Sequence, residues 1–309
     1  MKIVFMGTPD FAVPCLDVCH EHHEVIGVFT QPDRPKGRGK KLAAPPVKER
    51  ALELGYEVYQ PEKLKTPEMV SLLKDLAPDC IVVVAYGQIL SKEILDIPPH
   101  GCINVHGSLL PKYRGAAPIN WCIVHGEKET GITTMYMDVG LDTGDMIHKD
   151  TIAIPEDMNF GELYTELKPM GASVLKKSLE AIADGTAPRT PQNDADSCYA
   201  PLLNKKIAMI DWTKSASDIH NHIRGFNPIP VALTTYNGER VKVFTSEVLS
   251  ETTDKASGTI LSVSKEGLDV ATGNGVVRLV EVQFPNKKRL HVSQLILGYT
   301  IEVGVVLGA

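Results

Sequence analysis

Three side chains of types that can catalyse acyl transfer stand near the ends of predicted strands. Asn104 and His106 are two residues apart, and Asp142 lies in the glycine-flanked loop Gly140–Gly144. When an amine attacks a carbonyl group, the carbonyl oxygen gains negative charge, which the N–H groups of a carboxamide can stabilise. An imidazole can take a proton from the amine and give one to the leaving nitrogen, and a carboxylate can orient that imidazole. We therefore predict Asn104, His106 and Asp142 as catalytic residues.

The same residues have a simpler interpretation. An Asn or a His at the end of a strand often only hydrogen bonds to nearby backbone groups, and Gly140–Gly144 can be an ordinary turn. Arg114, in the irregular stretch that follows His106, either binds a phosphate or is structural. Residue types and spacing alone leave these alternatives open.

The elements that must position these residues alternate between strands and helices. Strands are predicted at Lys2–Met6, Glu24–Thr30, Tyr56–Tyr59, Asp79–Tyr86, Gly101–Val105, Gly131–Asp138 and Asp145–Ile154, and helices at Phe11–His20, Pro45–Leu54, Pro67–Leu76 and Asn159–Ile182. This alternation predicts an α/β fold with a Rossmann-like, mostly parallel sheet and helices on both faces. Ligands of such sheets bind at the carboxyl ends of the strands, where Asn104 and His106 lie. We also expect Asp10 to cap its helix and Pro169 to kink or split the long one.

The pattern changes in the last third of the chain. Residues 185–205 hold three prolines and few periodic apolar residues, as is typical of a linker. Beyond them, Asn237-Gly238 between two apolar runs predicts a hairpin, and three more short strands follow. Those strands are predicted at Gly258–Val263, Leu268–Thr272 and Val276–Gln283. We therefore predict a catalytic domain over residues 1–188, a linker over 189–205 and a small, OB-like β-barrel domain over 206–309.

Composition excludes several classes of protein. No stretch approaches the roughly 18 apolar residues of a membrane span, and GxGxxG is absent, so a dinucleotide site is not predicted. The six cysteines form no CxxC pair and the opening MKIVFMG is too short for a signal peptide, so we expect reduced thiols in a cytoplasmic protein. The cluster of Cys15, Cys19 and nearby histidines matches no zinc spacing, and no metal is expected.

Positive charge is concentrated in two short stretches, although the net charge is −6. Residues 34–41 hold five basic side chains: Arg34, Lys36, Arg38, Lys40 and Lys41. The second stretch, in the C-terminal domain, holds Lys287, Lys288 and Arg289. Most such runs are merely solvated surface. The alternative is a flexible arm and a barrel tip that meet the phosphates of a nucleic acid.

Several motifs together resemble the folate-dependent formyltransferases. The stretches that carry the resemblance are Asn104–Ile119, Gly131–Thr133 and Asp138–Asp145, with further matches at Gly7–Phe11, Phe29–Arg34, Val84–Gly87 and Ile210–Trp212. Nearly the whole chain is covered. Within this family, the chain is most similar to the branch that formylates the methionine carried by initiator tRNA.

This resemblance implies a substrate pair and a role for each site residue. The formyl group would pass from 10-formyltetrahydrofolate directly to the methionine α-amino group, with Asn104 holding the oxyanion, His106 moving protons and Asp142 holding His106. Folate would bind Val84, Ala85, Tyr86, Gly87, Gln88, Ser108, Leu109, Leu110, Pro111 and Asp138. Arg38 matches the arginine taken to read the tRNA acceptor end. We expect a monomer.

Two rival functions follow from the same residues. The first is a folate-dependent formyltransferase or formyl hydrolase that acts on a small-molecule acceptor, which would need neither the basic stretch 34–41 nor the C-terminal domain. The second is a non-catalytic RNA-binding protein, against which the intact set of Asn104, His106 and Asp142 argues.

Overall fold

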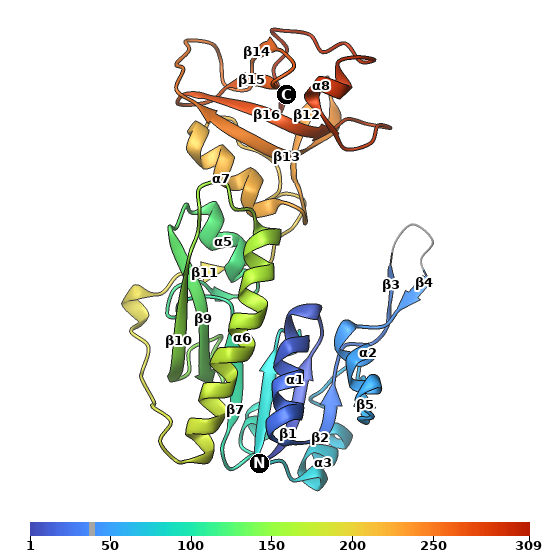
Figure 1. The fold of residues 1–309 in the computed structure, drawn as a ribbon, viewed down its shortest axis with the longest axis vertical. Coiled ribbons are helices and arrows are strands. Elements are labelled where there is room, and N and C mark those ends of the chain that lie inside the picture. Colours follow the sequence, from blue (N-terminus) through green and yellow to red (C-terminus); the bar gives the residue numbers. More distant parts are fainter. Residues whose placement is uncertain (37–40) are drawn as a thin grey trace. The chain divides into compact units, whose positions relative to one another are not determined.

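The computed structural model describes residues 1–36 and 41–309, which form two compact units (Figure 1). Unit 1 comprises Met1–Pro118, Gly131–Ile152 and Tyr164–Tyr199. Unit 2 comprises Ile119–Thr130, Ala153–Leu163 and Ala200–Ala309. Among the helices that the structure describes, none is both long and apolar enough to cross a membrane.

Unit 1 is built on a seven-stranded sheet in the order β10-β9-β7-β6-β1-β2-β5. The strands are β1 (Lys2–Gly7), β2 (Glu24–Phe29), β5 (Val58–Tyr59), β6 (Cys80–Val84), β7 (Cys102–His106), β9 (Glu129–Tyr136) and β10 (Met146–Ala153). From β5 to β7 all neighbouring strands are parallel, whereas β9 runs antiparallel to β7. The predicted α/β fold with a mostly parallel sheet is confirmed. Its central strand β6 is buried along its whole length, as a strand covered by helices on both faces must be.

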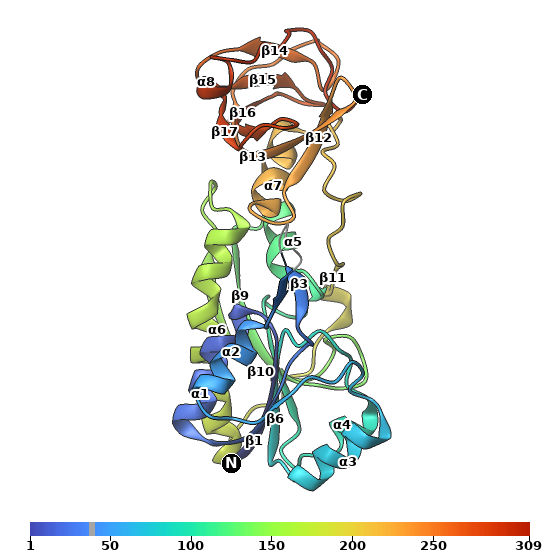
Figure 2. The same cartoon turned by 90° about the vertical axis from the view of Figure 1, so that its right-hand side faces the viewer.

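Helices cover both faces of this sheet. The helices α1 (Val13–His22), α2 (Pro46–Glu53) and α6 (Phe160–Ala183) lie on one face, and α3 (Pro67–Leu76) and α4 (Lys92–Leu95) on the other (Figure 2). Helix α3 has its predicted bounds because its ends carry strong local signals. The Oγ1 atom of Thr66 accepts a hydrogen bond from the backbone N of Met69, and Ala77 ends the helix in the left-handed conformation.

Pro169 does not split its helix, because α6 runs through it from Phe160 to Ala183, so the prediction of a split is wrong. A proline inside a helix costs about 3 kcal/mol through its missing N–H and its ring. Apolar side chains at helical spacing offset that cost, among them the fully buried Leu167, Leu175 and Leu179. Each such burial contributes about 1.5–3 kcal/mol, so packing decides against the local signal.

The prediction that Asp10 caps a helix is also wrong. A short 3-10 turn, η1 (Asp10–Ala12), precedes α1, and no side chain caps that helix. The carboxylate of Asp10 instead accepts hydrogen bonds from the Tyr164 hydroxyl at 2.7 Å and from Lys168 Nζ at 2.6 Å. The bond to the charged Lys168 is stronger than one to a backbone N–H and, with the bond to Tyr164, draws the side chain away from the helix end.

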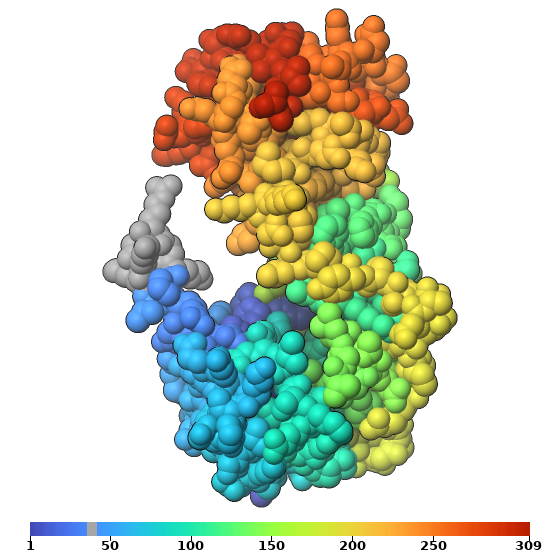
Figure 3. Space-filling model, turned by 180° about the vertical axis from the view of Figure 1, so that it is seen from behind, coloured from blue at the N-terminus to red at the C-terminus, as the bar shows by residue number. Residues whose placement is uncertain are grey.

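Residues 185–199, which we name the strap, run along the outer side of β9 and β10 in unit 1 (Figures 1 and 3). Thr190 and Met146 exchange two backbone hydrogen bonds of 2.9 and 3.0 Å. The strap contains the turn η2 (Asp194–Asp196) and ends at β11 (Tyr199–Ala200), which pairs with β8 (Arg114–Gly115). The first part of the segment that reads as a linker, up to Tyr199, therefore belongs to unit 1.

Unit 2 contains an antiparallel sheet in the order β12-β13-β16-β15-β14, with β17 beside β16. Its elements are α5 (Pro118–Val124), α7 (Ala216–Phe226), β12 (Ala232–Tyr236), β13 (Glu239–Leu249), β14 (Ile260–Val263), β15 (Leu268–Ala271), β16 (Val276–Gln283), β17 (Leu290–His291) and α8 (Val292–Leu295). Asn237 and Gly238 both have positive φ, as the predicted hairpin turn requires.

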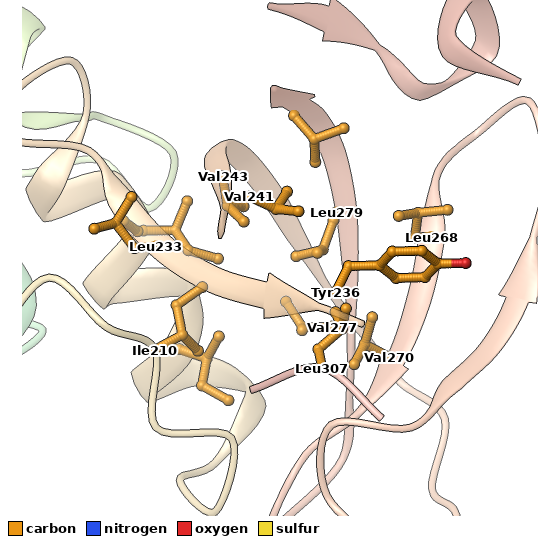
Figure 4. Packing of buried hydrophobic residues seen from close by; sticks show 14 of the residues in the cluster. Ile210, Leu233, Tyr236, Val241, Val243, Leu268, Val270, Val277, Leu279 and Leu307 are labelled. Atoms are coloured by element: carbon orange, nitrogen blue, oxygen red, sulfur yellow. The ribbon is translucent and has the colours of Figure 1, made fainter. Parts of the chain in front are cut away.

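The last residues of the chain close this sheet into a ring. Leu307 N donates to Gly258 O, next to β14, and Gly308 N donates to Thr235 O on β12, so the tail pairs with both edge strands. The predicted small β-barrel is confirmed in this form. Its interior is apolar, with Tyr236, Val243 and Leu279 from three strands packed together (Figure 4). Closure leaves no long edge strand exposed to other chains.

Candidate active site

Asn104, His106 and Asp142 come together in unit 1. Asn104 and His106 both lie on β7 and, being two residues apart, point to the same face of the sheet. Asp142 comes from the loop between β9 and β10. Its Oδ1 atom accepts a hydrogen bond of 3.3 Å from Asn104 Nδ2, and its Oδ2 atom lies 3.7 Å from His106 Nδ1. The three groups are thus close enough to act on one reactant, while their catalytic roles stay predictions.

Strand β7 fixes its two side chains through backbone pairing. On one side, β6 pairs with β7 up to Val83, which lies opposite Asn104. On the other side, the antiparallel β9 continues further and pairs Thr133 with His106. His106 therefore sits at the carboxyl end of the parallel part of the sheet but is still held by a neighbouring strand. This is the position at which open α/β sheets bind ligands.

The backbone of Tyr113 decides which nitrogen of His106 carries a proton. His106 Nε2 lies 2.8 Å from the Tyr113 carbonyl oxygen, and His106 is 5% exposed. Because a carbonyl only accepts hydrogen bonds, Nε2 must carry the hydrogen. In the neutral ring the free lone pair is therefore on Nδ1, which faces Asp142. We infer that Nδ1 is the nitrogen of His106 that can accept a proton from a substrate.

Asp142 is held in an unusual backbone conformation with φ +53°. Its Oδ2 atom accepts a hydrogen bond of 2.8 Å from Gly115 N, and its side chain is 13% exposed. The loop is also shaped from within, since Asp138 Oδ1 accepts hydrogen bonds from Gly140 N and Thr143 Oγ1. A side chain at Gly144 would come within 1.8 Å of the Tyr136 carbonyl oxygen, so this position requires glycine.

The predicted folate stretch Ser108–Pro111 is fixed by neighbouring strands. Leu110 N donates to Thr133 Oγ1, Thr133 Oγ1 donates to Ser108 O, and Lys149 Nζ donates to Leu110 O at 2.6 Å. Ser108 and Leu110 are buried, whereas Leu109 and Pro111 are partly exposed. A ligand beside this stretch would therefore meet Leu109, Pro111 and the backbone.

The second predicted folate stretch, Val84–Gln88, follows β6. Gln88 is already used within the protein, because its amide bonds to Leu64 N and Pro61 O. Tyr86 is buried, and its hydroxyl has no hydrogen-bond partner among the residues that the structure describes. Ala85 and Gly87 are exposed, with positive φ. Contacts to a ligand from this stretch would thus come from backbone groups.

Three exposed apolar residues next to the predicted folate positions were missed by sequence reasoning. Ile89 is 83% exposed, Val139 is 75% exposed and Leu141 is 53% exposed. Singly exposed apolar residues are common on protein surfaces, so it is their place beside the predicted folate positions that makes these three candidates for ligand contact. Their signal in the sequence was apolar character within otherwise polar loops that flank predicted site residues.

The described ends of the first basic stretch lie on two paired strands, and the prediction of a flexible arm falls partly on residues 37–40, outside the described residues. Strand β3 (Arg34–Lys36) pairs antiparallel with β4 (Lys41–Ala43), and Arg34 lies 3.4 Å from the exposed Glu62. Arg38 and Lys40 lie outside the residues that the structure describes. The exposed Arg34 places positive charge at the surface of unit 1, as a site for phosphate groups requires.

The second basic stretch lies in unit 2, beside β16 and β17. Arg289 pairs with Glu281, and its guanidinium group lies 4.3 Å from the ring centre of Phe244. Lys287 Nζ lies 5.7 Å from the ring centre of Tyr299, and Lys288 is exposed. Two of these three charges are therefore partly engaged within the unit, which leaves Lys288 as the side chain most available to a phosphate.

Gln192, which sequence reasoning assigned to a linker, touches the site from the strap, together with Arg114. Gln192 Nε2 donates hydrogen bonds of 2.8 Å to the carbonyl oxygens of both Asp142 and Gly144. Arg114 Nε donates to Gln192 Oε1 at 3.0 Å, and Arg114 Nη2 donates to Asp194 Oδ1 at 2.8 Å. These two bonds favour the structural role among the two alternatives for Arg114. No pattern in a single sequence marks these contacts, which span about 50 to 80 residues.

The buried cysteines of unit 1 are poor candidates for a nucleophile. Burial raises the pKa of the Cys15 and Cys80 thiols to about 12, so both stay protonated at neutral pH. The exposed Cys198 uses its sulfur to accept a hydrogen bond from Tyr113 N at 3.2 Å. Within residues 1–36 and 41–309 no group of three His, Cys, Asp or Glu side chains could hold a metal ion.

Comparison with known proteins gives a family to this geometry. Residues 1–179 match the formyl transferase family model and residues 202–300 match the model of the formyl transferase C-terminal domain. A methionyl-tRNA formyltransferase of Clostridioides difficile (strain 630) is 56% identical over 309 residues, and one of Acetivibrio thermocellus is 55% identical over 310, each covering all of both chains.

A solved structure shares the fold at lower identity. A sugar 3N-formyl transferase, crystallised in the presence of dTDP and 5-N-formyl-THF, superposes with a TM-score of 0.66 at 20% identity, covering 93% of this chain and 99% of that one. The identity of 56% and 55% over the full length to methionyl-tRNA formyltransferases is stronger evidence of family membership than this shared fold. The chain belongs to the methionyl-tRNA formyltransferases, within the formyl transferase family.

Proposed function

We propose that this chain transfers the formyl group of 10-formyltetrahydrofolate to the α-amino group of methionine on initiator tRNA, at the site formed by Asn104, His106 and Asp142. The observation that carries the proposal is the geometry of these residues. A carboxamide and an imidazole on one strand share a carboxylate, at 3.3 Å and 3.7 Å, in a chain similar over its full length to methionyl-tRNA formyltransferases.

In the first step the amine nitrogen attacks the formyl carbon, and the formyl oxygen becomes negatively charged. The amide of Asn104 has two N–H groups, of which one is directed at Asp142 Oδ1. The other is available to the oxyanion. A single donor of this kind contributes about 10²–10³ in rate.

Proton transfer belongs to His106. Its Nδ1 atom accepts a proton from the attacking amine, while Nε2–H stays on the Tyr113 carbonyl. Asp142 stabilises the imidazolium that forms. The same proton then passes to N10 of the folate as the C–N10 bond breaks, which releases tetrahydrofolate and formyl-methionyl-tRNA. No covalent enzyme intermediate is needed.

The folate co-substrate fits the surfaces beside these residues. Its flat ring system needs apolar cover and backbone hydrogen-bonding groups, which Leu109, Ile89, Val139 and the exposed backbone at Gly87 offer. Asp138 is already bonded within its own loop, so we assign it the shaping of that loop, not a direct folate contact.

The tRNA would contact the paired strands β3 and β4 in unit 1 and the stretch Lys287–Arg289 in unit 2. Each phosphate contact releases counterions, so affinity falls as salt rises. We expect Lys288→Ala to weaken tRNA binding about two- to fivefold and to lower the salt slope by about 0.7–0.9. The exposed Lys265→Ala in the same unit is the control. Equal salt slopes for all three proteins would remove Lys288 from the interface.

The decisive experiment compares acceptors. The purified protein is supplied with 10-formyltetrahydrofolate and, in separate reactions, initiator methionyl-tRNA, a dTDP-amino sugar or water. We expect formyl-methionyl-tRNA as the product, with the other two reactions at least 10³-fold slower, because a site built for one acceptor rejects others by about that factor. Faster formylation of the sugar, or hydrolysis alone, would support the rival small-molecule functions and overturn the proposal.

A further inference from the structure

We propose that Gln192 is a positioning residue for the catalytic carboxylate: its side-chain amide holds the loop that carries Asp142. The inference rests on the proposed function, since it concerns the conformation in which Asp142 faces His106. Gln192 lies 50 residues away from Asp142 in the sequence, on the strap, and belongs to no family motif that we identified.

The contacts of Gln192 fix the orientation of its amide. The NH₂ group donates to two acceptors, the carbonyl oxygens of Asp142 and Gly144, both at 2.8 Å. The amide oxygen accepts from the guanidinium group of Arg114 at 3.0 Å. If the amide were flipped, its oxygen would face two carbonyls and its NH₂ group would face a cation. Only one orientation satisfies all three partners.

The Asp142 loop is held from outside by Asn104 and Gly115 N, which bond to the Asp142 side chain, and by Gln192, which bonds to the loop backbone. Residues 138–141 are exposed. Asp142 has a φ of +53°, in the left-handed region that residues other than glycine seldom adopt. The hydrogen bonds of Asp138 to Gly140 and Thr143 stay within the loop. The two from Gln192 are bonds to the loop backbone from outside it, on either side of Thr143.

The strap in turn holds Gln192 in place. Arg114 bonds both to Gln192 and, through Nη2, to Asp194, and Thr190 exchanges two backbone hydrogen bonds with Met146. The guanidinium group of Arg189 lies 3.6 Å from the ring centre of Tyr136. The strap is thus held in place both before and after Gln192, by Thr190 and by Asp194. The amide of Gln192 can therefore keep the loop in a fixed position.

The first part of the test measures turnover. We expect Gln192→Ala and Gln192→Glu to lower kcat about 10- to 100-fold, with KM values for folate and tRNA within about threefold of wild type. Gln192→Glu keeps the volume and an acceptor for Arg114 but offers no N–H to the loop. The matched control is Asn193→Ala, an amide on the same strap that bonds only within it; its kcat should stay within twofold.

The second part measures hydrogen–deuterium exchange of the folded variants. Peptides that cover residues 138–146 should exchange faster in both Gln192 variants, with the rest of the chain unchanged. Three results would each overturn the inference: wild-type kcat in Gln192→Glu, unchanged exchange at 138–146, or faster exchange throughout the chain. If wild type fails to formylate methionyl-tRNA, the proposed function falls, while the exchange data still decide whether Gln192 holds the loop.

Discussion

The two sources of the proposed catalytic groups, strand β7 and the loop between β9 and β10, are built in opposite ways. Asn104 and His106 stand on a strand that pairs with neighbours on both sides and is mostly buried. Asp142 stands on a loop whose residues 138–141 are exposed, in a left-handed backbone conformation. The strand needs no side chain to hold its shape, because backbone hydrogen bonds do so.

This difference separates residues whose side chains take part in the proposed reaction from residues that fix the position of the Asp142 loop. On β7, a substitution of Asn104 or His106 removes a group of the proposed reaction but leaves the strand backbone in place. On the loop, a substitution that changes no reactive group can still move Asp142 away from His106. Displacements of about 1 Å are enough to cost about 10²-fold in rate. The predictions below follow this separation.

The largest effect is expected at His106. Because its Nδ1 is the proton acceptor in the proposed mechanism, His106→Asn should lower kcat about 10²- to 10⁴-fold. Exchange of loop residues 138–146 should not change, since β7 holds its own backbone. The exposed His20→Asn is the matched control. A kcat within tenfold of wild type, measured by formylation of methionyl-tRNA, would break the assignment.

A slightly smaller effect is expected at Asn104. Loss of the oxyanion donor in Asn104→Ala should lower kcat about 10²- to 10³-fold. Asn104→Asp keeps the shape but has no N–H and adds a charge beside Asp142, so it should be at least as slow. A faster Asn104→Asp than Asn104→Ala would contradict a donor role and indicate that only the packing of this side chain matters.

An intermediate effect is expected on the loop at Gly144. A methyl group there would stand 1.8 Å from a backbone oxygen that no side-chain rotation can move. Gly144→Ala should therefore shift the loop, lower kcat about 10- to 100-fold and cost about 1–3 kcal/mol of stability in chemical unfolding. Gly298→Ala, where nothing lies within 4 Å of the added methyl group, is the control. Unchanged activity would show that the loop adapts.

The smallest effect is expected at Lys149, which holds the predicted folate stretch through Leu110 O at 2.6 Å. Partial burial lowers the pKa of the Lys149 ammonium group. The hydrogen bond from Lys149 Nζ to Leu110 O is present all the same. Lys149→Met removes one hydrogen bond and should raise the KM for 10-formyltetrahydrofolate about 3- to 10-fold with little change in kcat. The exposed Lys177→Met on α6 is the control. A change in kcat alone would place Lys149 with the loop residues instead.

Much of the fold could be predicted because its signals are local. Helix α3 has its predicted bounds, with a threonine cap and a left-handed end, and the buried strand β6 lies within its predicted apolar run. Helix α7 was missed although its signal is present: Ser215 caps it, accepting from Asp218 N and donating to Asp218 Oδ2. Pro169 misled because tertiary packing outweighs one lost hydrogen bond.

The sequence by itself determined that Asn104 and His106 share one face at a strand end, because side chains alternate along a strand with a period of two. Its residue type and glycine-flanked loop made Asp142 a candidate partner, and the resemblance implied its role. Only the tertiary structure decided what holds these groups: the Tyr113 carbonyl that fixes the proton on His106 Nε2, and the strap glutamine on the Asp142 loop. Such contacts join segments that are far apart in the chain. Every residue type has a backbone carbonyl group, so the sequence does not show which residue accepts such a hydrogen bond.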